Sequence, residues 1–332
     1  MQIRKAVPTD KTAIIELLKK SLGESTIPKS ESLWSWKHEQ NPFGPSYVMV
    51  AEENNAVIGI RAFMQWNWQW NGKIYKAIRA VDTATHPDHQ GKGIFKKLTL
   101  EQAEKCKQQG VDFIFNTPNL QSKPGYLKMG WVEQGRMPLK FKVIRPLSLT
   151  FSMFFNKKKY QDYNGDPSPD QAWAMKDFDF LGKAGQNTQL ITTQISSAYI
   201  SWRYANNPLF RYNFFTDKKN YVLISRVKKQ SFKSELRLVD FFLLNPSASK
   251  KTVRVNVREQ ILEFCKMQAI DIISFSGPQF NTYRPFFNWM GIIPVKALGP
   301  IVTLKDLNMN GEFSSLLEVN NWGYSLGDLE LF

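Results

Sequence analysis

Residues 81–98 read Val81-Asp-Thr-Ala-Thr-His-Pro-Asp-His-Gln90-Gly-Lys-Gly-Ile-Phe-Lys-Lys-Leu98. The segment begins inside a predicted strand, because residues 78–85 are rich in β-branched side chains. It passes through Pro87 and the sequence Gln-Gly-Lys-Gly at 90–93, and then apolar residues recur every three or four positions. This order predicts a strand, a tight glycine turn and the start of an amphipathic helix that packs on a core.

The turn is suited to an anion. The first amides of a helix lack intrahelical partners and lie at the positive end of the helix dipole, where a phosphate is favoured. Gly91 and Gly93 have no Cβ, so a phosphate can approach the backbone closely, and Lys92 adds positive charge. The segment is neither a P-loop nor the dinucleotide fingerprint. On its own, the Gly-Lys-Gly triplet is also compatible with a solvated basic turn.

Length and composition limit the class of protein. A chain of 332 residues exceeds what one core usually organises, so two domains are expected. No uncharged apolar run reaches the roughly 18 to 20 residues that cross a bilayer, and the N-terminus lacks the apolar core of a signal peptide. Two cysteines, Cys106 and Cys265, do not form a disulfide framework. We therefore expect a soluble cytoplasmic protein without a membrane span.

Charge and the scarcity of histidine restrict the partners. The net charge is +15, from 44 basic and 29 acidic residues, which favours anionic ligands. Nucleic acid is not expected, because the charge is scattered and there is no arginine-rich arm, finger or RNP-type aromatic motif. Three histidines and two distant cysteines lack metal-ligand spacing, so no metal is expected.

The order of predicted elements before and after the turn adds a second clue. A strand at Ile3–Ala6 precedes two helices, one capped by Thr9 or Asp10 and one over residues 31–39. Antiparallel strands then lead to the strand at 78–85, with hairpin signals at 53–55 and Asn71-Gly72. After the motif helix, a short strand at Val111–Asn116 runs into Thr117-Pro-Asn-Leu-Gln-Ser-Lys-Pro-Gly-Tyr-Leu-Lys-Met-Gly-Trp131.

Residues 1–142 resemble the GNAT superfamily of N-acetyltransferases in the order of their predicted elements and in the sequence of two segments. The stretch from Gln90 resembles motif A, whose pattern is [Gln/Arg]-x-x-Gly-x-[Gly/Ala] after a strand. The later segment matches the family position by position at Asn119, Ser122, Tyr126, Gly130 and Trp131.

The resemblance implies an acetyl-CoA site. The cofactor-binding residues that it implies are Gln90, Gly91, Lys92, Gly93, Ile94 and Phe95 at the pyrophosphate, and Asn119 and Ser122 at the pantetheine arm. A backbone N–H at the strand end, among Thr83, Ala84 and Thr85, would bind the acetyl oxygen. Tyr126 matches the tyrosine that protonates the CoA thiolate in many members.

The general base is less defined. Asp82 follows the strand's Val81, and His86 and His89 flank the loop, where a histidine can titrate in the useful range. His38 and Glu39 could face the acceptor. Deprotonation through water, without a dedicated residue, also stays open.

The second half repeats landmarks of the first at a distance of about 160 residues. The repeated landmarks are Trp36-Lys-His-Glu-Gln-Asn-Pro-Phe43 with Trp202-Arg-Tyr-Ala-Asn-Asn-Pro-Leu209, Val81-Asp82 with Val239-Asp240, Cys106 and Asp112 with Cys265 and Asp271, and Met129-Gly130 with Met290-Gly291. Residues 246–252, opposite the glycine turn, contain no glycine. We therefore predict an α/β (α+β) protein of two tandem GNAT-like domains, each a mixed, mainly antiparallel twisted sheet flanked by helices. The first domain (1–145) binds acetyl-CoA, residues 146–170 form a linker, and the second (171–332) is degenerate, with a C-terminal tail that packs back.

The function that follows is transfer of an acetyl group from acetyl-CoA to a primary amine of a small acceptor, of amino sugar or amino acid type. Two alternatives stay open: an aminoacyl or peptidyl transferase of the tandem GNAT-like type, and a non-catalytic acyl-CoA-binding or interaction module. The sequence does not define the acceptor or the oligomeric state.

Overall fold

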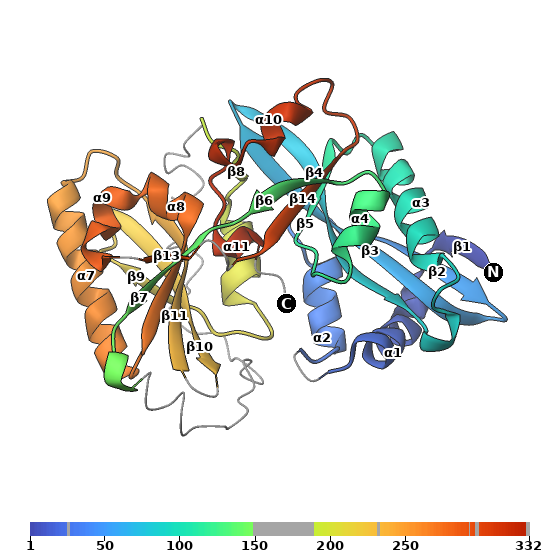
Figure 1. The fold of residues 1–332 in the computed structure, drawn as a ribbon, viewed down its shortest axis with the longest axis horizontal. Coiled ribbons are helices and arrows are strands. Elements are labelled where there is room, and N and C mark those ends of the chain that lie inside the picture. Colours follow the sequence, from blue (N-terminus) through green and yellow to red (C-terminus); the bar gives the residue numbers. More distant parts are fainter. Residues whose placement is uncertain (25–26, 149–188, 231–232, 292, 296–298, 330–332) are drawn as a thin grey trace. The chain divides into compact units, whose positions relative to one another are not determined.

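The computed structural model describes residues 1–24, 27–148, 189–230, 233–291, 293–295 and 299–329. The chain divides into two compact units (Figure 1). The first contains Met1–Gly135 and Pro300–Asn321, and the second contains Arg136–Gly299 and Trp322–Phe332.

The first unit is built on a mixed sheet whose strand order is β1-β2-β3-β4-β5-β14-β6. Its strands are β1 (Gln2–Lys5), β2 (Tyr47–Glu53), β3 (Ala56–Trp70), β4 (Lys73–Thr85), β5 (Phe113–Asn116), β6 (Val132–Arg136) and β14 (Ile301–Asp306). The pair β4–β5 is parallel, whereas β1–β2, β2–β3, β3–β4 and β5–β14 are antiparallel. Asn54-Asn55 and Asn71-Gly72 turn the two hairpins with positive φ at both positions, as a two-residue turn that matches strand twist requires.

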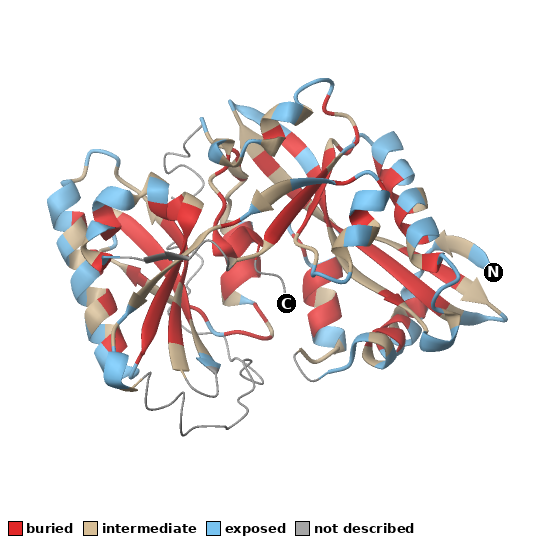
Figure 2. Cartoon of the chain, viewed as in Figure 1, coloured by how far each residue is buried: buried red, intermediate tan, exposed pale blue. Residues whose placement is uncertain are grey.

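Helices cover both faces of this sheet. They are η1 (Pro8–Asp10), α1 (Lys11–Leu22), α2 (Glu31–Trp34), the π-helix η2 (Ser35–Glu39), η3 (Pro87–His89), α3 (Ile94–Gln108), α4 (Lys123–Lys128), α10 (Phe313–Leu317) and η7 (Val319–Asn321). The buried face of α1 packs with Val50, Ile60 and Ala84. The apolar stripe of α3 packs on the opposite side, where Ile94 and Leu98 meet Ala51 and Cys106 lies in the cluster of Phe63 and Ile78. Figure 2 shows these strands buried and the outer helix surfaces exposed.

Two irregularities of β4 create the place where a site can form. Arg61 pairs with Thr83 and Phe63 pairs with Ala80, so β4 contains one extra residue, a bulge at Val81-Asp82. Strand β5 pairs with β4 only at Ala77–Arg79. The last part of β4 therefore has an edge that β5 does not cover, and the bulge redirects its side chains.

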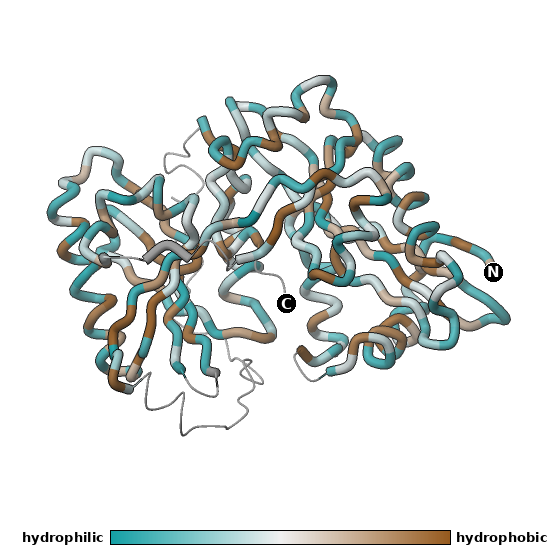
Figure 3. Tube along the Cα trace, in the orientation of Figure 1, coloured by the Kyte–Doolittle hydropathy of each residue, from teal (hydrophilic) through white to brown (hydrophobic). Residues whose placement is uncertain are grey.

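The second unit repeats this plan with the strand order β13-β7-β12-β11-β10-β9. Its strands are β7 (Leu139–Val143), β9 (Asn213–Thr216), β10 (Tyr221–Gln230), β11 (Lys233–Leu243), β12 (Ile272–Ser276) and β13 (Ile293–Val295). The two-residue strand β8 (Thr192–Thr193) also belongs to this unit but is not part of its sheet. Its helices are α6 (Ser197–Ile200), the π-helix η5 (Ser201–Ala205), α7 (Lys250–Met267), α8 (Gly277–Thr282), α9 (Arg284–Phe287), η6 (Asn288–Met290) and α11 (Leu326–Leu329). Again one central pair, β11–β12, is parallel. The predicted fold class, with mixed and mainly antiparallel sheets flanked by helices, is confirmed in both units, and Figure 3 shows hydrophobic segments running through the strands of each.

The unit boundaries differ from the predicted 1–145 and 171–332. Strand β7 pairs with β12 in the second unit, although it precedes residue 145. Strand β14 pairs with β5 in the first unit, although it lies near the C-terminus. Most of the predicted linker, residues 149–170, lies outside the described residues. The predicted tail contributes to the second unit, where Trp322 and Tyr324 are buried and stack at 4.3 Å between ring centroids.

Candidate active site

The glycine turn ends at the first residue of α3 and is open. Gly91 and Gly93 have φ values of 77° and 74°, and a Cβ added to either would meet nothing within 4 Å. No side chain caps α3, whose N-cap is Gly93. Among the described residues, the amides of Gly91, Lys92 and Gly93 have no hydrogen-bond partner. The turn therefore presents free N–H groups at the positive end of a helix of 15 residues.

The corresponding helix of the second unit is closed. Ser249 is the N-cap of α7, and its hydroxyl accepts a hydrogen bond from the amide of Thr252. Every turn residue from Pro246 to Ser249 has a Cβ. The contrast agrees with the prediction that only the first glycine turn can hold a pyrophosphate, which stays a prediction.

The end of β4 presents amides toward the edge that β5 leaves free. The amide of His86 donates to the carbonyl of Ile58 on β3 at 2.8 Å. Because antiparallel pairs alternate in direction, Ala84 also faces β3, whereas the amides of Thr83 and Thr85 face the opposite edge. Of the three predicted donors for an acetyl oxygen, the amides of Thr83 and Thr85 therefore face the free edge of β4, and the amide of Ala84 does not.

Asp82, on the bulge, is held by two residues of the π-helix η2. Its Oδ2 lies 2.7 Å from Lys37 Nζ and 2.8 Å from His38 Nε2. His38 Nδ1 lies 2.9 Å from the Ser46 hydroxyl. Lys37 and His38 are both 3% exposed, whereas the Asp82 side chain keeps 16% of its surface accessible. One ionisable group of this cluster can therefore meet a ligand.

The charges of the cluster follow from its contacts. Burial alone would raise the pKa of Asp82, but Lys37 and His38 outweigh it and hold the pKa well below the usual range for a carboxyl group. Burial lowers the pKa of His38, although Asp82 opposes this effect. A neutral His38 that donates from Nε2 to Asp82 accepts from Ser46 at Nδ1. Asp82 is thus a permanent carboxylate, better suited to binding a cation than to taking a proton.

Tyr126, on α4, is buried in the core beneath the start of α3. Its hydroxyl accepts a hydrogen bond of 2.8 Å from Nη1 of Arg61, which is completely buried. The Phe95 ring lies edge-on to Tyr126 at 5.6 Å. Phe95 stands where motif A has a small residue, a departure that places an aromatic ring between the turn and Tyr126.

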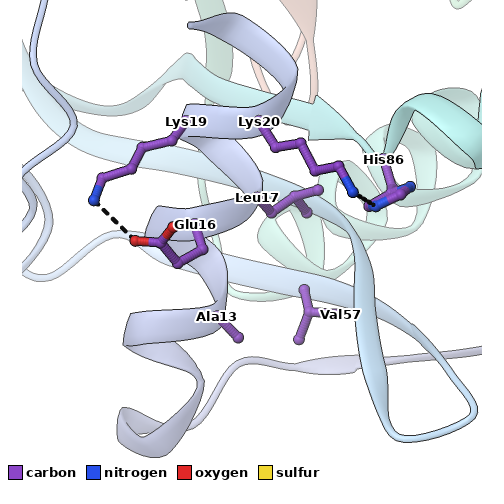
Figure 4. A pocket seen from close by; sticks show the side chains of 7 residues that line it. All are labelled: Ala13, Glu16, Leu17, Lys19, Lys20, Val57 and His86. Carbon is purple, nitrogen blue, oxygen red and sulfur yellow. Dashed lines mark hydrogen bonds and ion pairs between the residues drawn. The ribbon is translucent and has the colours of Figure 1, made fainter. Parts of the chain in front are cut away.

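The remaining predicted residues have local partners. Asn119 Oδ1 accepts from the amide and hydroxyl of Ser122 at 2.8 and 2.9 Å, so the pair forms a turn before α4. His86 Nε2 lies 2.8 Å from Lys20 Nζ, and both residues line the hollow between α1 and the end of β4 that Figure 4 shows. Glu39 is exposed and pairs with Lys11 at 3.0 Å. No described contact joins His86 to Asp82 or to Tyr126.

Two residues of the site were missed by the sequence analysis. Lys37 lies inside the repeated segment that begins at Trp36, and Arg203 holds the same place in the segment that begins at Trp202, so the repeat itself indicated a basic residue there. Arg61 interrupts an apolar run from Val57 to Met64. A charged residue in a buried strand is rare unless it is paired, and this was the available signal.

Among the described residues, no three histidine, cysteine or acidic side chains gather as a metal site would require. Within the same ranges, no helix has both the length and the apolar character needed to pass through a bilayer. Cys106 and Cys265 are free and buried, and burial raises the pKa of each thiol to about 12.

Known proteins resemble the first unit. The acetyltransferase (GNAT) domain matches residues 2–133. An L-amino acid N-acyltransferase of Escherichia coli is 32% identical over 108 residues, covering 31% of this chain and 61% of that protein. An L-methionine sulfoximine/L-methionine sulfone acetyltransferase of Salmonella typhimurium is 28% identical over 162 residues, 46% of this chain and 92% of that protein.

A solved structure extends the likeness of fold beyond the matched residues. The structure of a probable N-acyltransferase from Enterococcus faecalis superposes with a TM-score of 0.63 at 11% identity, covering 94% of this chain and 74% of that one. At this identity the likeness concerns the fold alone. Residues 2–133 therefore match the GNAT acetyltransferase domain, the family that the glycine turn and the Asn119–Trp131 segment predicted.

Proposed function

We propose that the protein is an N-acetyltransferase whose first unit transfers an acetyl group from acetyl-CoA to the primary amine of a small acceptor. The observation on which this depends is the open glycine turn at the start of α3, with free amides and no side chain over them. A pyrophosphate is the part of acetyl-CoA that such a turn binds. The match of residues 2–133 to the GNAT acetyltransferase domain supports the same donor.

We assign the binding roles as follows. The amides from Gly91 to Ile94 bind the pyrophosphate, whereas the amide of Gln90 already donates to the Pro87 carbonyl at 3.3 Å. Phe95 packs beside the arm that follows the pyrophosphate. The amide of Thr83 or Thr85 binds the acetyl oxygen, which gains negative charge when the amine attacks. Asn119 and Ser122 flank the pantetheine arm, and Tyr126 returns a proton to the sulfur.

We assign Asp82 to the acceptor rather than to proton abstraction. A general base works best with a pKa near the working pH, whereas Lys37 and His38 hold the pKa of Asp82 far below it. A partly exposed carboxylate is suited to orienting an ammonium group. Deprotonation then takes place through water, and His86, at the end of the same strand, is the second candidate for it.

The names of the relatives support one acceptor class. The names of both bacterial relatives refer to amino acids or their analogues, so we infer a small acceptor of the amino acid type. The net charge of +15 favours an acceptor that also has a negative group.

We also infer that the two units are tandem copies of one domain. Tyr204 of the π-helix η5 contacts Asp240 of β11, as His38 of η2 contacts Asp82 of β4. The carboxylates of Asp112 and Asp271 accept from backbone amides at the equivalent places in their sheets. The second copy keeps this framework without the glycine turn, and we assign it no cofactor site.

The test begins with binding. Calorimetry should detect acetyl-CoA binding to the wild-type protein, and Gly91→Asp should weaken it at least about 100-fold, because the new carboxylate occupies the phosphate position. Gly72→Asp is the matched control: Gly72 has the same φ of 77° and equally open surroundings, but it lies in the β3–β4 hairpin.

The second step measures thiol release with a panel of amino acids and other primary amines. Release that depends on an amine supports the enzyme. Tight binding without release by any amine would indicate a non-catalytic acyl-CoA-binding protein. Absence of binding would leave the peptidyl transferase or the interaction module.

A further inference from the structure

We propose that Arg61 is a positioning residue for the reaction, which orients the Tyr126 hydroxyl toward the sulfur of CoA and stabilises the phenolate left after proton transfer. This inference rests on the proposed function. It concerns a residue of β3 that neither the sequence pattern nor the family match assigns.

The buried Arg61 guanidinium has one hydrogen-bond acceptor among the described residues, the Tyr126 hydroxyl oxygen. Arg61 is 0% exposed, and its Nη1 donates to Tyr126 Oη at 2.8 Å. Among the described residues, its Nε and Nη2 have no hydrogen-bond partner. Its Cζ lies 4.5, 6.0 and 5.4 Å from the ring centroids of Phe63, Phe95 and Tyr126. No carboxylate pairs with Arg61 among the described residues.

This contact fixes the direction of the tyrosine proton. A guanidinium only donates hydrogen bonds, so Tyr126 Oη must accept, and its own hydrogen has to point elsewhere. Without Arg61 the hydroxyl hydrogen would be free to rotate. The proton is therefore available to a second acceptor, which we identify as the leaving sulfur.

The positive charge of Arg61, which no carboxylate neutralises among the described residues, explains how Arg61 would stabilise the Tyr126 phenolate. A buried cation without a counter-ion destabilises the folded protein, and its cost falls when a negative charge forms beside it. When the tetrahedral intermediate collapses, the C–S bond breaks and its electron pair moves to sulfur. The sulfur takes the Tyr126 proton to give CoA-SH, and the phenolate remains 2.8 Å from Nη1. The proton released by the acceptor amine reaches Tyr126 through solvent and restores the hydroxyl.

The second unit shows that the fold does not require this pair. Leu223 pairs with Phe241, the residue after Asp240, just as Arg61 pairs with Thr83, the residue after Asp82. Phe287 precedes Met290 by the same interval as Tyr126 precedes Met129. Leu223 and Phe287 are both completely buried in one apolar cluster. The unit without glycines in its turn thus has two apolar residues where the first unit has an arginine and a tyrosine.

The test is a double-mutant cycle on the full chain with Arg61→Leu, Tyr126→Phe and both together, the double variant reproducing the residues of the second unit. We expect each single change to lower kcat about 100-fold, in the range of general acid catalysis, with KM for acetyl-CoA changed less than about threefold. The double variant should be no slower than the singles, because Arg61 acts through Tyr126. Tyr75→Phe is the control, since Tyr75 is another buried tyrosine whose hydroxyl is hydrogen-bonded, to Glu312.

Thermal unfolding of the wild type, the two single variants Arg61→Leu and Tyr126→Phe, and the double variant separates effects on catalysis from effects on folding. Each single variant should melt below the wild type, because each leaves one polar group buried without its partner, and the double variant should recover. Effects on kcat that multiply in the double variant, or a double variant that melts below both singles, would overturn the role of Arg61. Thiol release that Arg61→Leu leaves intact would do the same. Wild-type protein that releases no thiol with any amine would instead refute the proposed function itself.

Discussion

At the scale of single residues, the cluster around Asp82 gives the sharpest prediction. Asp82→Asn removes the counter-ion of Lys37, which is buried, and we expect the free energy of unfolding to fall by about 3 kcal/mol. In protein that remains folded, KM for the amine should rise at least about tenfold, since a hydrogen bond to a charged group contributes about 1.5–3 kcal/mol. Steady-state kinetics with varied amine measures this. Asp306→Asn, at an exposed position at the end of β14, is the control. An unchanged KM in folded Asp82→Asn would remove Asp82 from the acceptor site.

The pKa of Asp240 is shifted in the opposite direction from that of Asp82, which predicts a pH-dependent stability. Burial, together with the nearby Asp328, raises its pKa to about 7, although hydrogen bonds from Tyr204 and Ser325 oppose the shift. The folded state therefore holds this proton more tightly than the unfolded state, where the carboxyl titrates at its usual value near 3.8. The destabilisation is complete above about pH 7 and is relieved as pH falls toward about 4.

The measurement is the melting temperature of wild type and Asp240→Asn between about pH 8 and pH 5. The difference between the two proteins removes the titration of the groups that do not interact with Asp240 or Asp328. We expect Asp240→Asn to gain stability over the wild type at the upper end of this range and to lose that advantage toward the lower end. A difference independent of pH would contradict the shifted pKa of Asp240.

At the scale of elements, two serines cap equivalent helices. The Ser30 hydroxyl accepts from the amide of Leu33 at 3.1 Å, and the Ser196 hydroxyl accepts from Tyr199 at 3.1 Å. Alanine at either position should lower the free energy of unfolding by about 1 kcal/mol. Only Ser30→Ala should also raise KM for the amine, because α2 leads directly into the π-helix with Lys37 and His38. Equal kinetic effects of the two variants would argue against a catalytic role restricted to the first unit.

The elements were predictable where their signals were local. Glycine, asparagine and the apolar spacing of α3 defined the turns and the motif helix, because each acts within a few residues. The π-helix η2 was predicted as an ordinary helix over 31–39. Its wider turn directs two adjacent residues, Lys37 and His38, toward Asp82, which lies more than 40 residues away. No local pattern reports such a contact, so the ionised cluster was not predicted in full.

At the scale of the molecule, the repeated landmarks indicated two copies but not which strands complete each sheet. Strands β7 and β14 hold equivalent places, each antiparallel to the short parallel strand of its sheet. Strand β7 comes from the first half of the chain and joins the second unit, and β14 makes the reciprocal exchange. Either assignment satisfies the same hydrogen bonds, so the sequence pattern cannot distinguish them. This is the physical reason why the predicted boundary at residue 145 differs from the structure.

The exchange predicts how fragments of the chain behave. Residues 1–145 lack β14, so β5 loses its neighbour, and the contacts of Thr303 with Asn116 and of Lys305 with the Met129 carbonyl disappear. An uncovered central strand exposes unpaired backbone groups, and we expect this fragment to lack a cooperative melting transition and to bind no acetyl-CoA.

Residues 1–135 joined by a short glycine and serine linker to residues 300–321 should recover both properties, because β14 neighbours β6 in the sheet. Circular dichroism and calorimetry on the two fragments measure the difference. Cooperative melting of residues 1–145 with full acetyl-CoA affinity would show that β14 is dispensable. In that case the Asn116–Met129 region, which leads to Tyr126, would have to hold its geometry without the strand that packs beside it.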